Sequence, residues 1–175
     1  MKINSGVFPL MRVAVLMAAG VLLGNGCAGY RLGSTLPPGI DTIHIPSFVN
    51  ETEEPLLDVE TTRAAIQDFQ QDGTLKVSNQ EQADAQLDVR LTRFVLEPLR
   101  YDNDEVRTAR EYRMRITADI TFQRLSDGAI LTQRSVQGEA TFDFEGDIAS
   151  SKQSVLPVAA EDLAHEIVES VVELW

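Results

Sequence analysis

The side chains best suited to binding chemistry are arginines, and they concentrate in one part of the chain. Seven of them fall within the 26 residues 90–115, namely Arg90, Arg93, Arg100, Arg107, Arg110, Arg113 and Arg115. A guanidinium group presents a planar fork of donors that fits phosphate and carboxylate oxygens. The cluster therefore predicts either an anion-binding surface or ion pairs with nearby acids. The acids available for such pairs are Asp102, Asp104, Glu105, Glu111 and Asp119.

The other reactive side chains form no catalytic or metal-binding pattern. The sequence contains no nucleophile elbow, phosphate-binding loop or dinucleotide fingerprint. Its two histidines, His44 and His165, are expected on a strand and on the polar face of a helix, whereas zinc sites gather three or four ligands. The acids Asp102 and Asp104 suit a turn better than acid–base catalysis. We therefore expect no enzymatic activity, no metal and no cofactor.

Cys27 is the single cysteine of the 175 residues, and it follows a short apolar segment. The eleven residues after Arg12 are uncharged, as in a secretory signal, and are too few for a membrane span of about 20 residues. Small residues precede Cys27 as in the lipobox of bacterial lipoproteins, with Gly24 where leucine is usual. These features predict a signal peptide over residues 1–26 and lipid attachment at Cys27. An ordinary cleaved signal that contains a cysteine is the alternative.

Ala28, rather than aspartate, follows the cysteine. By resemblance to the sorting rule of bacterial lipoproteins, this favours the outer membrane. Either Met1 or Met11 suits the start of translation, because the first ten residues add nothing that a signal requires. The chain from residue 27 onwards carries 13 basic and 27 acidic side chains, a net charge of −14. Such a charge argues against nucleic acid as a partner, since phosphate binding needs a broad basic surface.

Five strands are expected from alternating or short apolar segments bounded by turn residues. They cover residues 42–46, 74–78, 85–97, 112–123 and 129–142. The alternation of the third strand breaks at residues 93–95, which predicts a bulge. Pro98 is expected to end that strand, and a polar loop should follow over residues 99–109. Residues 126–128 read Ser-Asp-Gly and predict a hairpin turn.

A first amphipathic helix is expected over residues 55–71. Thr52 should cap it, Pro55 should lie in its first turn, and Gly73 follows where a C-terminal glycine is expected. Its apolar face should comprise Leu56, Val59, Ala65, Ile66 and Phe69.

A second helix is expected over residues 154–175, capped by Ser151 or Ser154 and with Pro157 in its first turn. Its wide apolar stripe comprises Leu156, Ala160, Leu163, Ala164, Ile167, Val168 and Val171. The element order β-α-β-β-β-β-α predicts an α+β fold, a single mixed β-sheet with two amphipathic helices packed on one face. The other face is polar and should remain exposed unless something outside the chain covers it.

Several short motifs follow one another along the chain from the cysteine onwards. They are Cys27-Ala28-Gly29-Tyr30-Arg31-Leu32, Leu36-Pro37, Ile43-His44-Ile45-Pro46-Ser47-Phe48-Val49-Asn50, Glu54-Pro55 and Glu111-Tyr112-Arg113. A C-terminal amphipathic helix comes after them. In this order, and over nearly the whole chain after the signal, they resemble the LptE family of lipopolysaccharide-assembly lipoproteins.

The resemblance implies a lipidated cysteine and tether over residues 27–40 and a small α/β sandwich over residues 41–175. It implies an anchor at the periplasmic face of the outer membrane. It further implies that the protein plugs the lumen of the β-barrel translocon LptD, helps the barrel to assemble, and binds lipopolysaccharide during delivery to the outer leaflet. The net charge of −14 favours the plug role over direct lipid binding, because lipopolysaccharide is anionic.

The arginine cluster then has a candidate role at the hairpin formed by the third and fourth strands. Arg107, Arg110, Arg113 and Arg115 are the candidates for contact with the phosphates of lipid A or with acidic groups of the barrel. We expect Arg107 and Arg110, at the end of the loop, to matter most.

Two other functions stay open at this point. One is a generic periplasmic binding or regulatory lipoprotein, for example an activator of a cell-wall enzyme. The other is a hydrolase with an unrecognised site, which would need a cleft with perturbed carboxylates or histidines. Co-purification with a large outer-membrane barrel distinguishes the LptE-like role from the generic one.

Overall fold

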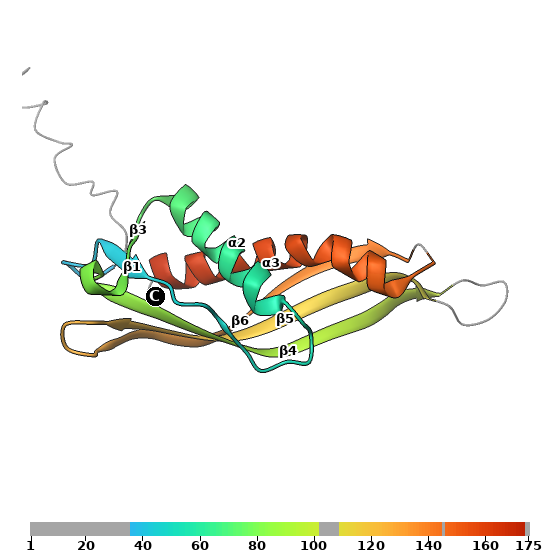
Figure 1. Ribbon diagram of the computed structural model, residues 1–175, viewed down its shortest axis with the longest axis horizontal. Helices are drawn as coiled ribbons and strands as arrows, with labels where there is room; N and C mark the ends of the chain where they lie inside the picture. The colour runs from blue at the N-terminus through green and yellow to red at the C-terminus, as the bar shows by residue number, and fades with distance from the viewer. Residues whose placement is uncertain (1–35, 102–108, 145, 174–175) are drawn as a thin grey trace, which may run out of the picture. The chain divides into compact units, whose positions relative to one another are not determined.

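The computed structural model describes residues 36–101, 109–144 and 146–173, which lie within one compact unit, Ser34–Trp175 (Figure 1). Its elements are β1 (Thr42–His44), β2 (Val49–Asn50), α2 (Leu57–Asp72), β3 (Lys76–Val77), the short 3₁₀ helix η1 (Gln80–Gln82), β4 (Ala85–Tyr101), β5 (Ala109–Arg124), β6 (Ile130–Asp143) and α3 (Ile148–Val172). The predicted signal peptide, lipidated cysteine and tether lie outside the described residues, apart from the last residues of the tether.

The strands form one mixed sheet in the order β3-β1-β4-β5-β6, with β2 also pairing with β4. β1 and β2 run parallel to β4, whereas β4, β5 and β6 are antiparallel neighbours. The predicted α+β class with a single mixed sheet and two helices is therefore confirmed. β2 was not predicted, because two residues are too few to show an alternating pattern.

β4 is longer than the sequence pattern indicates. It continues through Pro98 to Tyr101, so the prediction that Pro98 ends the strand is wrong. Pro98 lies opposite Tyr112 of β5, and the register shifts after it. A proline is tolerated on a strand that has a neighbour on one side only. The bulge predicted near residue 93 is confirmed, since the register shifts between Leu91 and Arg93.

The start of α2 differs from the prediction. Leu56 precedes the helix in a left-handed conformation with φ of 63°, and no side chain caps the helix. Thr52 is held elsewhere, because its amide and hydroxyl donate to Oδ1 of Asn50 at 3.0 and 2.7 Å. Pro55 therefore lies in the connection before the helix. The end of the helix is as predicted, with Gly73 in the left-handed conformation.

The buried face of α2 is also shifted from the predicted one. Ala65 and Phe69 are buried as predicted, but Leu56 and Val59 are exposed. The buried residues of the helix are Leu57, Thr61, Ala64, Ala65 and Phe69. The shift follows from the start of the helix at Leu57 and from packing against α3, which small alanines permit.

α3 begins earlier than predicted. Asp147 caps it by accepting hydrogen bonds from the amides of Ala149 and Ser150 at 3.3 and 3.0 Å. Ser151 and Ser154, the predicted caps, lie inside the helix, and so does Pro157. Aspartate is as good a cap as serine and its charge complements the helix dipole, so Asp147 sets the start.

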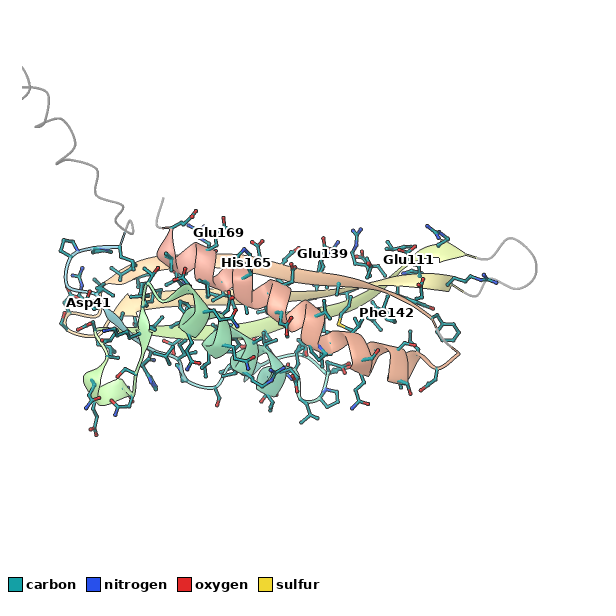
Figure 2. The ribbon with its side chains drawn as sticks, turned by 90° about the horizontal axis from the view of Figure 1, so that it is seen from above. Asp41, Glu111, Glu139, Phe142, His165 and Glu169 are labelled. Atoms are coloured by element: carbon teal, nitrogen blue, oxygen red, sulfur yellow. The ribbon has the colours of Figure 1, made fainter. Side chains whose placement is uncertain are left out.

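The apolar stripe predicted for this helix is buried throughout. α3 packs on β5 and β6, α2 packs against α3, and both helices lie on one side of the sheet (Figures 1 and 2). The sheet contributes Met114, Ile116, Ala118, Ile120 and Phe122 of β5 to the same core. The predicted alternation of β5 is thus confirmed.

Helix and sheet touch most closely at Gly138 of β6. A Cβ atom at this position would lie 2.3 Å from the backbone nitrogen of Leu163 in α3. Beside it, the amide of Glu139 donates to Oδ2 of Asp162 at 2.8 Å. These two contacts fix where α3 crosses β6.

Candidate interaction surface on the polar face of the sheet

The side of β4, β5 and β6 that faces away from the helices carries mainly polar side chains. We call this surface the polar sheet face. On β5 it comprises Glu111, Arg113, Arg115, Thr117, Asp119, Thr121 and Gln123. Their direct neighbours on β6 are Asp143, Thr141, Glu139, Gln137, Ser135, Gln133 and Ile130. No described helix or strand lies over it, since both helices pack on the opposite side (Figure 1).

A network of ion pairs occupies one end of the polar sheet face. Nη1 of Arg115 lies 3.0 Å from Oε1 of Glu97, and its Nη2 lies 3.3 Å from Oε2 of Glu139. The same Glu139 oxygen lies 3.5 Å from Nε of Arg113. Arg100 pairs with Glu111 at 3.4 Å. All these groups are partly exposed, so the pairs add little stability.

The predicted contact residues are only partly brought together. Arg113 and Arg115 share the polar sheet face and share Glu139 as a partner. Arg110 is exposed at the start of β5, where its carbonyl accepts a hydrogen bond from the amide of Phe144 at 2.7 Å. Arg107 and Cys27 lie outside the described residues.

Glu111, which pairs with Arg100, is one of the acids predicted as partners, whereas Glu97 and Glu139, the partners of Arg115, were not predicted. Glu139 is distant from Arg115 in the chain. Yet each of the two lies twelve residues from Asp127, in the hairpin turn. Paired residues of an antiparallel hairpin are symmetric about its turn. The position of the turn therefore predicts that Arg115 and Glu139 lie opposite each other.

A second arrangement lies on the helix side of the sheet. Nζ of Lys152 in α3 pairs with Oε2 of Glu54 at 2.7 Å and lies 5.9 Å from the ring centre of Phe94 in β4. A pocket of about 420 Å³ adjoins this ion pair. Its lining includes Pro55, Leu56, Ala149, Leu156 and Pro157. We call it the Lys152 pocket.

Sequence reasoning missed the Lys152 pocket because its parts are far apart in the chain. Lys152 and Glu54 are 98 positions apart. Their contact depends on the connection before α2, where Nδ2 of Asn50 donates to the carbonyl of Glu54 at 2.7 Å. No local pattern of residues signals a contact of this kind.

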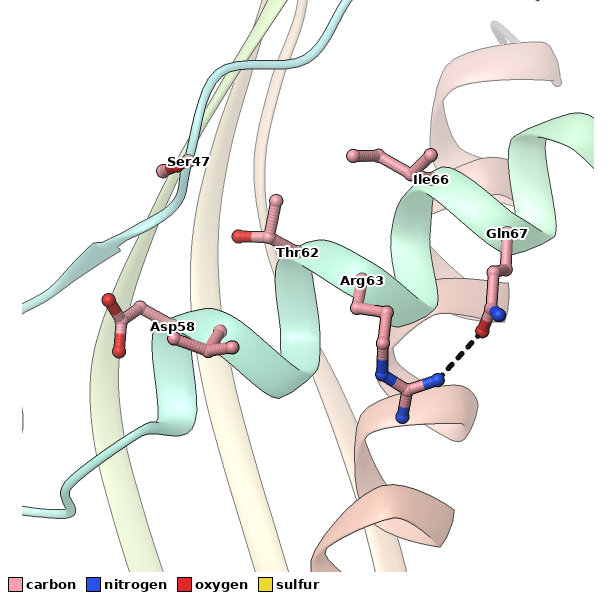
Figure 3. A pocket seen from close by; sticks show the side chains of 7 residues that line it. Ser47, Asp58, Thr62, Arg63, Ile66 and Gln67 are labelled. Carbon is pink, nitrogen blue, oxygen red and sulfur yellow. Dashed lines mark hydrogen bonds between the residues drawn. The ribbon is translucent and has the colours of Figure 1, made fainter.

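Further pockets border α2. Figure 3 shows one of about 390 Å³ beside Ser47, lined by Asp58, Thr62, Arg63, Ile66 and Gln67 together with Val59. In it Arg63 donates to Gln67 at 2.9 Å. The hydroxyl oxygen of Thr62 in this pocket accepts a hydrogen bond from the amide of Phe48 at 2.9 Å.

The second pocket, of about 320 Å³, lies between α2 and α3 and includes Asp68 and His165. Nδ1 of His165 is 3.8 Å from Oδ2 of Asp68, too far for a hydrogen bond. Within the described parts of the chain, no group of three or more histidine, cysteine, aspartate or glutamate residues is placed to hold a metal ion. In the same parts, no helix is both long enough and apolar enough to cross a membrane.

Among the described residues, three aspartates have lowered pKa values, and each accepts hydrogen bonds from backbone amides. The hydroxyl of Thr42 donates to Asp84 at 2.7 Å and lowers the pKa of that carboxyl, aided by the amides of Asp41 and Thr42. The amide of Ala129 lowers the pKa of Asp127 in the hairpin turn. The hydroxyl and amide of Ser150 lower the pKa of Asp147 at the start of α3. The hydrogen bonds that lower these pKa values stabilise turns and the start of a helix.

Comparisons with known proteins agree with this architecture. The family model of LptE, described as lipopolysaccharide-assembly, matches residues 40–173. No curated protein matches the chain.

Solved structures with a similar fold share little sequence with this chain. A protein from Xanthomonas campestris is 11% identical, with 79% of this chain and 90% of that chain covered and a TM-score of 0.55. A hypothetical protein from Chlamydia trachomatis is 9% identical, with 75% and 98% covered and a TM-score of 0.53. An uncharacterized lipoprotein B from Nitrosomonas europaea is 12% identical, with 82% and 86% covered and a TM-score of 0.50. At such identities the likeness concerns the fold alone.

Proposed function

The chain belongs to the LptE family of lipopolysaccharide-assembly proteins, and we propose that it plugs and helps to assemble an LptD-like outer-membrane β-barrel. In this proposal residues 1–26 are a signal peptide, Cys27 carries the lipid anchor, residues 27–40 form the tether, and residues 41–175 form the working domain. The domain acts at the periplasmic face of the outer membrane. There it assists insertion of lipopolysaccharide into the outer leaflet without catalysing a reaction.

The observation that carries the plug role is the polar sheet face. The centre of this face combines the neutral groups of Thr117, Thr121 and Ser135 with the charged pair Arg90 and Asp119, which lie opposite each other on β4 and β5. The lumen of an outer-membrane barrel is lined by polar side chains. Polar side chains with charges of opposite sign on neighbouring strands can face such a wall at less desolvation cost than unpaired charges could.

Direct contact with lipopolysaccharide is opposed at long range by the acidic charge of the chain, so it requires local basic groups. Arg107, Arg110, Arg113 and Arg115 remain the proposed contacts for its phosphates. Arg113 and Arg115 already have Glu139 as a partner, so a phosphate must compete with that carboxylate. Arg107 and Arg110, at the end of the loop, are the contacts that we expect to matter most.

The plug role is tested by purifying the full, lipidated chain from membranes in mild detergent. We expect a large outer-membrane β-barrel to co-purify in a fixed ratio. Replacing Thr117 and Thr121 by glutamate adds charge to the centre of the polar sheet face, so it should reduce recovery of the barrel without loss of folding. Recovery of the chain without any barrel would instead favour a generic periplasmic binding or regulatory lipoprotein.

The lipid contact is tested by the double charge reversal Arg107→Glu and Arg110→Glu. We expect weaker capture of lipopolysaccharide by the purified chain, because two donors become repulsive acids. Arg134→Glu is the matched control, since Arg134 is an exposed arginine of β6 toward the other end of the hairpin. Equal capture by the double variant and the wild-type chain would eliminate these arginines as a ligand site.

A further inference from the structure

One edge of β4 changes its character partway along the strand. Up to Leu91 this edge is occupied by β1 and then β2, with Asn50 opposite Leu91. The last hydrogen bond of the row runs from the amide of Glu51 to the carbonyl of Leu91 at 3.0 Å. Beyond it, β4 continues from Arg93 to Tyr101 and, among the described residues, pairs only with β5. We call this stretch the open edge of β4.

Charged residues and Pro98 flank the open edge, but the centre of this edge carries no such protection against pairing. Phe94, Val95 and Leu96 are three consecutive apolar residues, all half-buried. The other edges of the sheet are blocked in different ways: β3 has only two residues, and Asp162 of α3 accepts the amide of Glu139 in β6. Unpaired strand edges with apolar side chains are templates for pairing with another chain.

The Lys152 pocket lies on the helix side of the same stretch. Phe94 and Leu96 lie opposite the buried Ile116 and Met114 of β5, so they face the helices, and the ammonium of Lys152 lies over the ring of Phe94. A strand added beside β4 here would direct every second side chain towards that side. The pocket, at about 420 Å³, has room for a large apolar side chain.

Leu56 at the rim of this pocket gives an independent indication of binding. It is the one non-glycine residue with positive φ among the described residues, and its side chain is 66% exposed. The left-handed conformation of a leucine costs about 1–2 kcal/mol of conformational free energy. In the isolated chain, the exposed side chain of Leu56 buries little apolar surface to offset this cost. Such strain is characteristic of ligand clamps.

We propose that the open edge of β4 pairs with an extended segment of the barrel partner, which places an apolar side chain in the Lys152 pocket. The segment continues the row that β1 and β2 begin. A polypeptide strand fits because only a backbone offers donors and acceptors at the spacing of a strand edge; an acyl chain offers neither. This inference rests on the proposed function and adds the mode of contact.

The test places a photoreactive amino acid at Arg93, Val95 or Glu97 of the full chain in living cells. These three side chains lie on the same side of the strand, opposite Thr117, Arg115 and Arg113. If a strand pairs there, crosslinks from the three positions should fall on one segment of the barrel and step along it by two residues. Crosslinks without this step, or the absence of crosslinks, would overturn the proposal.

The same probe at Thr117 and Thr121 separates this proposal from the plug role. If β5 crosslinks to the barrel but the three positions of β4 show no crosslinks that step by two residues, strand pairing is excluded and the plug role stands. If the crosslinks that step by two residues fall on a different protein, the barrel is not the partner of the open edge. Absence of barrel crosslinks from all five positions would contradict both proposals.

A second variant tests the pocket without disturbing the core. Ala149→Trp fills the pocket from an exposed position of α3, and we expect at least a tenfold loss of barrel recovered with the chain. Val158→Trp is the control, since Val158 is 53% exposed on the same helix and does not line the Lys152 pocket. Circular dichroism checks that both variants fold. Equal recovery of the barrel by the two variants would show that no side chain occupies the pocket.

Discussion

Asp84 shows how one residue joins two parts of the sheet. Its Oδ2 accepts hydrogen bonds from the amides of Asp41 and Thr42 and from the hydroxyl of Thr42, at 3.1, 3.0 and 2.7 Å. In return, the amide of Asp84 donates to the Thr42 hydroxyl oxygen at 2.9 Å. The carboxylate thus binds the start of β1 to the residue that precedes β4. Its ionised form is the better acceptor, which is why its pKa is lowered.

This arrangement predicts a pH-dependent loss of stability. The pKa of Asp84 in the folded chain lies below its ordinary value of 3.8. The carboxylate therefore stabilises the fold above pH 3.8, and this contribution is lost as pH falls through the folded-state pKa. We expect Asp84→Asn to lower the free energy of unfolding at pH 7, and the difference from wild type to shrink as pH falls below 3.8. Denaturant unfolding across this range measures the difference. A constant difference at all pH values would contradict the assignment.

Leu56 predicts a conflict between stability and binding. Asparagine adopts the left-handed conformation more readily than leucine, so Leu56→Asn should raise the free energy of unfolding by up to about 1 kcal/mol. The same change removes an apolar group from the rim of the Lys152 pocket, so less barrel should co-purify. Thermal unfolding and detergent co-purification measure the two effects. Lower stability of the variant would show that the leucine side chain supports the isolated fold.

At the scale of the elements, the crossing of α3 over β6 holds the two layers together. Gly138 is required there by close approach rather than by backbone conformation, because the backbone of Leu163 occupies the space of a Cβ atom. We expect Gly138→Ala to reduce the free energy of unfolding by about 3 kcal/mol, since neither backbone can easily move away. Gln137→Ala, an exposed neighbour on the polar sheet face, should change it by less than about 0.5 kcal/mol. Urea unfolding of both variants measures this, and similar values for the two would contradict the close contact.

At the scale of the whole molecule, the acidic charge sets how the chain meets an anionic lipid. Residues 27–175 carry a net charge of −14, so long-range repulsion should slow association with lipopolysaccharide. Salt screens such repulsion, and we expect the association rate to rise several-fold between about 10 and 300 mM NaCl. Binding of an uncharged detergent measured in parallel should not accelerate. A rate that falls with salt would instead indicate that the local arginines dominate the encounter.

Much of the fold follows from local patterns in the sequence. The alternation of residues 112–123 predicts β5 because side chains of a strand point alternately to its two faces. The stripe from Leu156 to Val171 predicts the buried face of α3 because its spacing matches the helical period. Gly73 predicts a helix end since glycine adopts positive φ without steric cost. Each of these features depends on residues close together in the chain, and each is confirmed.

What the sequence alone could not decide depends on competition between distant groups. Thr52 is a good cap in isolation, but Asn50 holds it in another turn, and Asn50 is itself positioned by pairing of β2 with β4. A proline normally ends a strand, but Pro98 lies in the part of β4 that has a neighbour on one side only. From residue type alone, the arginine cluster predicted either anion binding or ion pairs, whereas tertiary structure assigned Glu97 and Glu139 as partners of Arg115. The open edge of β4 and the Lys152 pocket likewise exist only once strands and helices meet, because both are made by segments that no local interaction brings together.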